Sequence, residues 1–127
     1  MLKILIADDS IHVRHALRTC LELNPAWEVC AEAQDGQAAI EAVRQTAPDL
    51  VLLDYSMPLM NGLEAAREIK SISPGSAMFL FTMYASDPLR RLAEDAGVRT
   101  VISKDVGGVS ALVKAIEEIV HNADKLS

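Results

Sequence analysis

Five side chains that can take part in chemistry each stand at the end of a short apolar run. They are three carboxylates, a hydroxyl and an ammonium: Asp8, Asp9, Asp54, Thr82 and Lys104. Three carboxylates brought to one place repel one another unless a cation lies between them. Oxygen ligands from short side chains suit Mg²⁺, which keeps several waters and readily contacts a phosphoryl oxygen. If the fold gathers these residues, we expect a Mg²⁺ site that can also hold a phosphoryl group.

The roles within this set follow from its chemistry. Lys104 supplies a second positive charge and Thr82 a hydroxyl donor, both suited to the anionic oxygens of a phosphoryl group. Asp54 is then free to act as a carboxylate nucleophile that forms an aspartyl phosphate. The sequence has no glycine-rich nucleotide loop, so we do not expect ATP bound to this chain as the phosphoryl donor.

Residues 50–62, which read LVLLDYSMPLMNG, place Asp54 at the end of a predicted central strand. Four apolar residues bounded by turn signals are typical of a parallel strand that is buried on both faces. Open α/β sheets bind their ligands at the carboxyl ends of such strands. Pro58 and the pair Asn61 and Gly62 cannot continue a strand, so they predict a loop after Asp54.

Similar apolar runs alternate with helical patterns along the chain, with a period of roughly 24 residues. The predicted strands are residues 3–7, 27–33, 50–53, 77–82 and 100–103, of which 27–33 alternates in polarity and is an outer strand. Helices are predicted after Ser10, after Asp35 and over residues 62–71, 88–96 and 109–121. Five strands that are each followed by a helix predict a parallel α/β sheet with right-handed crossovers and helices on both faces.

The first of these helices has a distinct apolar face. That face is predicted to hold Val13, Ala16, Leu17, Cys20 and Leu21. Cys20 and Cys30 have no metal or redox spacing, and we expect both to be buried thiols in a reducing cytoplasm.

Composition bounds the class of protein. The chain has 127 residues, enough for one domain with its own core, and half of them are hydrophobic. The net charge of −6 argues against direct binding of nucleic acid. No apolar stretch approaches the length of a membrane span, and the chain opens into a strand pattern with no signal peptide. We therefore expect a cytoplasmic protein that does not bind membranes.

The chemical set, in this order and with these spacings, resembles the receiver domains of response regulators in two-component signalling. The resemblance runs from about residue 3 to residue 121. It implies a (βα)5 flavodoxin-like fold with strand order 2-1-3-4-5, formed by residues 1–122 and followed by a polar tail at 123–127. It also implies that Asp54 accepts a phosphoryl group from a sensor histidine kinase or phosphotransfer protein.

The same resemblance implies roles for the other residues of the set. Mg²⁺ would be held by Asp9, Asp54 and the backbone carbonyl of Ser56, with Asp8 acting partly through water. Lys104 would pair with the phosphoryl group. Thr82 would move towards that group and pull the following loop, so that the face formed by the fourth helix, fifth strand and fifth helix changes a dimer or partner surface.

Two positions depart from the family pattern. Many receivers have a cis proline after the lysine, whereas Asp105 follows Lys104 here, and we expect a trans bond because a non-proline cis bond costs roughly 3–4 kcal/mol. Val101 stands where the family often has an aromatic switch residue, so the signal is expected to pass through helix and loop shifts. Both features resemble receivers attached to a LuxR-type helix-turn-helix output domain.

Alternatives remain open from the sequence. The chain is either a stand-alone receiver or part of a longer regulator that controls transcription through a separate output domain. An interaction-only receiver that does not use phosphate is a second interpretation. A small Mg²⁺-dependent aspartyl phosphatase is a third, although such an enzyme normally has a cap over its substrate. Only in that third case would the chain be an enzyme with an external substrate.

Overall fold

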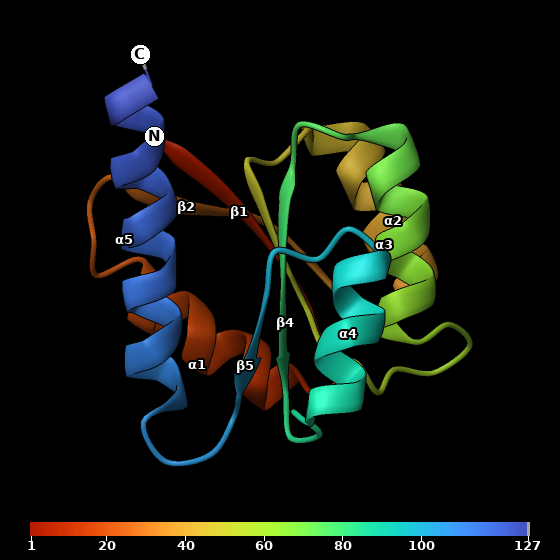
Figure 1. Cartoon of the computed structure of the whole chain (residues 1–127). Coiled ribbons are helices and arrows are strands. Elements are labelled where there is room, and N and C mark those ends of the chain that lie inside the picture. Colours follow the sequence, from red (N-terminus) through yellow and green to blue (C-terminus); the bar gives the residue numbers. More distant parts are fainter. Residues whose placement is uncertain (127) are drawn as a thin grey trace.

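A single parallel sheet of five strands forms the centre of the molecule (Figure 1). The computed structural model describes residues 1–126, with side chains to residue 122. The strands lie in the order β2-β1-β3-β4-β5, which confirms the expected order. Their bounds are β1 (Leu2–Ala7), β2 (Trp27–Ala33), β3 (Leu50–Leu53), β4 (Ala77–Thr82) and β5 (Thr100–Ser103). Every strand end that carries a predicted site residue therefore lies on one edge of the sheet.

Five helices cover the two faces of this sheet. They are α1 (Ile11–Leu21), α2 (Gly36–Thr46), α3 (Gly62–Ile72), α4 (Asp87–Asp95) and α5 (Gly108–Leu126). Helices α2, α3 and α4 pack on one face, and α1 and α5 pack on the other, each over its own apolar cluster (Figure 1). No helix among the described residues is long and apolar enough to cross a membrane.

Polar side chains fix where four of the helices begin. Ser10, Asp35, Asn61 and Ser86 each accept a hydrogen bond from the backbone N–H three residues later. Asn61 also forms a capping box with Glu64, in which each side chain accepts from the other residue's backbone. These caps confirm the helix starts that were predicted after Ser10 and Asp35.

Strand β3 holds Asp54 in a crowded place. All four of its residues are buried between β1 and β4, as the apolar run predicted. After the loop the chain passes back against the end of this strand, where the Gly62 N–H donates to the Tyr55 carbonyl at 2.8 Å. A Cβ on Gly62 would lie 2.3 Å from the Asp54 carbonyl oxygen, so only glycine allows α3 to start this close to the strand end.

Strand β2 contains an irregularity that its sequence does not reveal. Ile4 of β1 pairs with Val29 and the next residue, Leu5, pairs with Ala31, which leaves Cys30 as an extra residue in β2. Such a bulge reverses the faces of the side chains that follow it. The expected simple alternation of residues 27–33 is therefore wrong: Val29 faces α1 and α5, whereas Ala31 packs towards α2.

Three smaller expectations are also corrected. Cys20 and Cys30 are free thiols but only half-buried. Ala16 is exposed and does not belong to the buried face of α1. Helix α5 continues to Leu126, beyond the predicted end at residue 121, because no glycine or proline stops it. Most of the predicted tail 123–127 is thus helical backbone, and Ser127 lies outside the described residues.

Candidate metal centre

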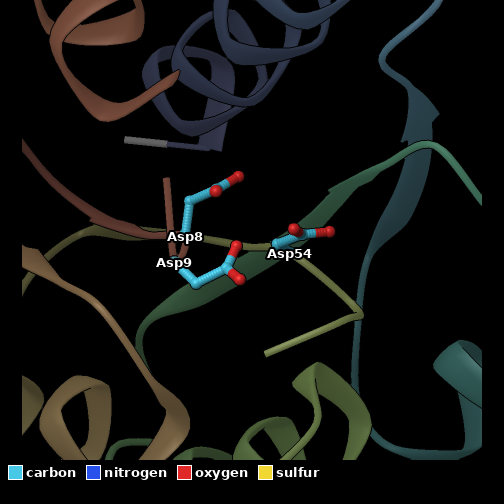
Figure 2. Close-up of side chains that lie close together, drawn as sticks. All are labelled: Asp8, Asp9 and Asp54. Atoms are coloured by element: carbon cyan, nitrogen blue, oxygen red, sulfur yellow. The ribbon is translucent and has the colours of Figure 1, made fainter. Parts of the chain in front are cut away.

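Three carboxylates converge at the carboxyl edge of the sheet (Figure 2). Asp8 and Asp9 follow β1, and Asp54 follows β3. One carboxylate oxygen from each lies within 4.8 Å of the other two. Asp8 and Asp54 are buried, whereas Asp9 is exposed. The fold thus gathers the acidic residues that the sequence predicted would lie together.

The two oxygens of Asp8 already have partners. Its Oδ1 accepts the Ser10 N–H at 2.9 Å, and its Oδ2 accepts from the Lys104 ammonium at 2.5 Å. Asp9 and Asp54 therefore present the more accessible oxygens to a cation. The expectation that Asp8 would act partly through a water molecule stays a prediction.

Lys104 connects two of the carboxylates. Its Nζ lies 2.5 Å from Asp8 Oδ2 and 3.2 Å from Asp54 Oδ2, with only 13% of the side chain exposed. Burial by itself would lower the pKa of Lys104, but the hydrogen bond to Asp8 and the charges of Asp54 and Asp8 outweigh it and raise the pKa. Lys104 therefore places a positive charge within the acidic cluster of Asp8, Asp9 and Asp54.

Asp54 stands in an environment that disfavours its charge. Burial raises the pKa of its carboxyl, Lys104 opposes this by its charge, and the charge of Asp8 raises the pKa further. Hydrogen bonds from Lys104 and from the backbone N–H of Ser56 lower it, but the net pKa is raised. A bound cation would stabilise the ionised form of this carboxylate, and reaction with an electrophile would remove its unfavourable charge.

Thr82 and Lys104 lie side by side at the ends of the neighbouring strands β4 and β5. The Lys104 N–H donates to the Thr82 carbonyl at 3.0 Å, one residue beyond the pairing of Thr82 with Ser103. Thr82 is fully buried, and its Oγ1 accepts the Tyr84 N–H at 3.2 Å. The hydroxyl is thereby tied to the loop that follows β4. The trans bond expected after Lys104 is confirmed, since no cis peptide occurs in the part of the chain described.

The structure also reveals two contacts near the site that the sequence did not predict. Tyr55 and Tyr84, from the loops after β3 and β4, meet edge to face with ring centroids 6.4 Å apart. Arg14 of α1 donates through Nη1 to the Asp8 carbonyl at 2.6 Å. Side chains in a helix lean towards its N-terminus. A basic residue one turn after the N-cap Ser10 was therefore a usable sequence signal for the contact between Arg14 and Asp8.

The donor chemistry fits Mg²⁺. The cluster offers carboxylate oxygens and no sulfur or imidazole ligand. Such hard oxygen ligands suit Mg²⁺ better than the softer transition metals. Ser56, two residues after Asp54, is exposed, and its backbone carbonyl stays a predicted ligand.

Comparison with known proteins identifies the family. The sequence model described as the response regulator receiver domain matches residues 4–117. The chain belongs to this family. Its relatives include the transcriptional regulatory protein LnrK of Bacillus subtilis, 34% identical over 91% of this chain and 52% of that protein. A protein-glutamate methylesterase/protein-glutamine glutaminase of Pyrococcus horikoshii is 33% identical over 98% of this chain and 32% of that protein.

Solved structures give the same family and fold. A two-component response regulator of the LuxR family from Aurantimonas superposes with a TM-score of 0.88 and 32% identity, over 94% of this chain and 85% of that one. This receiver therefore has the flavodoxin-like fold of its family. It spans about half of the first curated relative named above and about a third of the second.

Proposed function

We propose that this receiver domain is a phosphorylation-controlled switch in two-component signalling. Asp54 accepts a phosphoryl group from the phosphohistidine of a sensor histidine kinase or a phosphotransfer protein. The observation that carries the proposal is the bridge made by Lys104, which lies 2.5 Å from Asp8 and 3.2 Å from Asp54 inside a cluster of three carboxylates. This arrangement supports cation binding and phosphoryl transfer together.

The chain's own residues account for the transfer. An oxygen of Asp54 attacks phosphorus, the new bond is P–O, and the P–N bond to the donor histidine breaks, with the electron pair staying on nitrogen. Asp9, Asp54 and the Ser56 carbonyl would hold Mg²⁺, with Asp8 acting through water. Bound Mg²⁺ supplies charge neutralisation at the phosphoryl oxygens. Lys104 supplies a second positive charge within reach of Asp54.

Thr82 offers a route from the site to the surface. Its hydroxyl accepts the Tyr84 N–H and still has its own proton to donate to a phosphoryl oxygen. A shift of Thr82 towards the phosphoryl group would therefore draw the loop after β4 with it. We propose that this shift changes the face formed by α4, β5 and α5 and so alters a homodimer or partner contact, with a coupling of roughly 1–3 kcal/mol.

The output of the switch is proposed at a coarser level. Residues 1–122 would form the receiver, with residues 123–127 following it, in the cytoplasm and away from membranes. Regulation of transcription would need an output domain on a longer protein or a partner, because the net charge of −6 disfavours direct binding of nucleic acid by this chain. The chain's own chemistry would be self-directed: phosphorylation of Asp54 and later hydrolysis.

The test is the intact mass of the chain after incubation with acetyl phosphate, with and without Mg²⁺. We expect one added phosphoryl group that requires both Mg²⁺ and Asp54. Asp54→Asn should abolish the gain, whereas the control Asp95→Asn, at the exposed end of α4, should not. If neither the wild type nor Asp95→Asn gains mass in any condition, the interaction-only alternative replaces this proposal. Turnover of small phosphomonoesters would instead favour the phosphatase alternative.

A further inference from the structure

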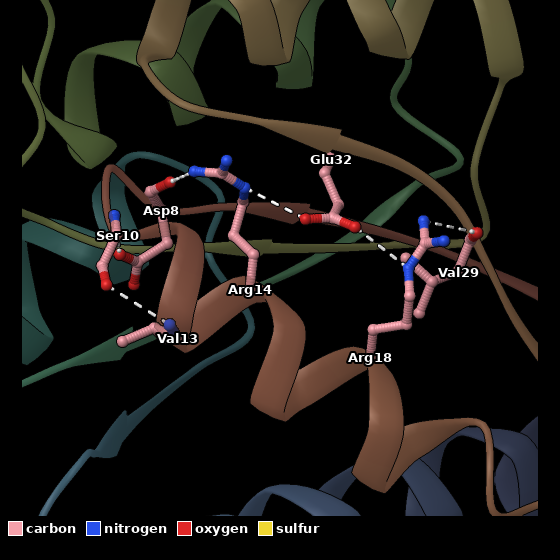
Figure 3. A network of polar contacts seen from close by, with 7 residues as sticks. All are labelled: Asp8, Ser10, Val13, Arg14, Arg18, Val29 and Glu32. Atoms are coloured by element: carbon pink, nitrogen blue, oxygen red, sulfur yellow. Dashed lines mark hydrogen bonds and ion pairs between the residues drawn. The ribbon is translucent and has the colours of Figure 1, made fainter.

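A polar network joins the acidic turn after β1, which holds Asp8 and Asp9, to the neighbouring strand β2 (Figure 3). Arg14 of α1 lies at its centre, with 12% of its side chain exposed. Its Nη1 donates to the Asp8 carbonyl at 2.6 Å, and its Nε donates to Glu32 Oε1 at 3.1 Å. One planar guanidinium therefore holds the backbone of the acidic turn and a carboxylate on β2 at the same time.

The bulge in β2 makes this network possible. If Cys30 took a regular place in the ladder, Glu32 would come three positions after Val29 and lie on the opposite face of the sheet. With the bulge, Glu32 lies on the α1 side and reaches Arg14. The anchor of Arg14 is thus built into the backbone of the strand.

Arg18 provides a natural contrast to Arg14. Its Nε lies 3.0 Å from the second oxygen of Glu32, close enough for an ion pair but without hydrogen-bond geometry. Its side chain is 40% exposed, and its other contact is a long one, 3.5 Å to the Val29 carbonyl. Arg18 therefore shares the charge partner of Arg14 but does not touch the acidic turn (Figure 3).

We propose that Arg14 is a positioning residue for the metal-binding carboxylates. By holding the Asp8 carbonyl against β2, it fixes the turn from which Asp8 and Asp9 reach the site. The inference rests on the proposed function, because it assumes that these carboxylates bind Mg²⁺.

The direction in which Mg²⁺ affinity changes distinguishes a positioning role of Arg14 from a purely electrostatic one. Arg14 is a cation close to the site, so its removal would strengthen Mg²⁺ binding if only Coulomb repulsion mattered. Loss of positioning acts in the opposite direction, and the loss of an outer partner of a metal ligand typically weakens binding about 10- to 100-fold. We expect Arg14→Ala to weaken Mg²⁺ binding about tenfold, at the lower end of that range.

The experiment is a Mg²⁺ titration of the whole chain, followed by the backbone amide NMR signals around the site. Arg14→Ala and Arg14→Lys should both bind more weakly than wild type, because lysine keeps the charge but lacks the planar fork that spans two acceptors. The control Arg18→Ala should stay within about twofold, since it removes a more exposed cation that shares Glu32 with Arg14 but does not touch the acidic turn. Thermal melting of each variant reports separately on stability.

Two results would overturn the inference and can be told apart from failure of the proposed function. If the wild type binds Mg²⁺ and both Arg14 variants bind as tightly or more tightly, Arg14 does not position the ligands. A lower melting temperature with an unchanged Mg²⁺ dissociation constant would show a purely structural role, and it also counts against the inference. If the wild type itself does not bind Mg²⁺, the proposed function fails together with the inference.

Discussion

Replacement of Lys104 by methionine should destabilise the fold strongly in the absence of Mg²⁺. The ammonium lies 2.5 Å from Asp8 and 3.2 Å from Asp54, and all three side chains are largely buried. At an effective dielectric constant of about 20, these separations correspond to gross attractions of about 6.6 and 5.2 kcal/mol. The variant keeps both carboxylates but loses both attractions.

Protonation limits how large the loss can become. Asp54 can avoid its uncompensated charge by taking a proton, and from an ordinary pKa of 3.8 this costs at most about 4.4 kcal/mol at pH 7. We therefore expect Lys104→Met to lower the free energy of unfolding by about 3–4 kcal/mol, as is typical when one partner of a buried pair is removed. For a domain of this size the melting temperature should fall by about 12–16 °C.

Chemical denaturation at pH 7, with and without Mg²⁺, is the assay. Mg²⁺ should stabilise the variant more than the wild type, because the ion takes the place of the missing ammonium and no longer competes with it. Lys114→Met is the control, since Lys114 is exposed on α5 and should change stability by less than about 0.5 kcal/mol. A loss below about 1 kcal/mol, or an equal loss with and without Mg²⁺, would refute the reasoning.

The same pair of proteins gives an alkaline test. The pKa of Lys104 is raised in the folded state, so its stabilising contribution is complete below 10.5 and is lost as the pH rises through the raised value. The stability difference between wild type and Lys104→Met should therefore be constant from about pH 8 to 10 and shrink above that. A difference that stays constant through the alkaline range would contradict the assigned pKa shift.

Three further predictions concern the surroundings of the site. Gly62→Ala should destabilise the fold by about 3 kcal/mol, because its Cβ would lie 2.3 Å from the Asp54 carbonyl oxygen, whereas Gly75→Ala has open space and should be near neutral in the same denaturation assay. Thr82→Ala should speed hydrogen exchange of the Tyr84 amide, which loses its acceptor, and Thr82→Ser should not. Because the pKa of Asp54 is raised in the folded state, the unfolded chain loses this proton first. The free energy of unfolding therefore falls as the pH rises from 3.8 to the raised value. Asp54→Asn should therefore gain stability over wild type between pH 4 and pH 7, and equal melting differences at both pH values would argue against the shift.

Local signals were enough to predict the sheet and its chemical edge. Strand β3 ends at Asp54 because Asp, Pro and Asn-Gly cannot continue a buried strand, and its predicted bounds match the structure. The bounds of β2, β4 and β5 were likewise predicted from residue type alone. Once the parallel topology is inferred, the gathering of Asp8, Asp54 and Lys104 follows from geometry.

What the sequence could not reveal depends on contacts between distant segments. The bulge at Cys30 is a property of the ladder between β1 and β2, and nothing in the alternating pattern of residues 27–33 marks it. That pattern places Glu32 on the wrong face, so its contact with Arg14 could not be inferred. The partial exposure of Cys20 has a similar cause, because the depth of a helix face depends on the helices that pack beside it.

The bulge at Cys30 also bears on how this segment can vary in length during evolution. Deletion of Cys30 would restore regular pairing with β1 and leave Glu32 opposite Ile6 and Ala33 opposite Ala7, on the faces that they occupy now. An insertion between Ala31 and Glu32 would instead place Glu32 opposite Ala7 and point its charge at the apolar layer under α2. Lineages of this protein should therefore tolerate the loss of the extra residue, and many side chains at Cys30, but few insertions between the bulge and Glu32.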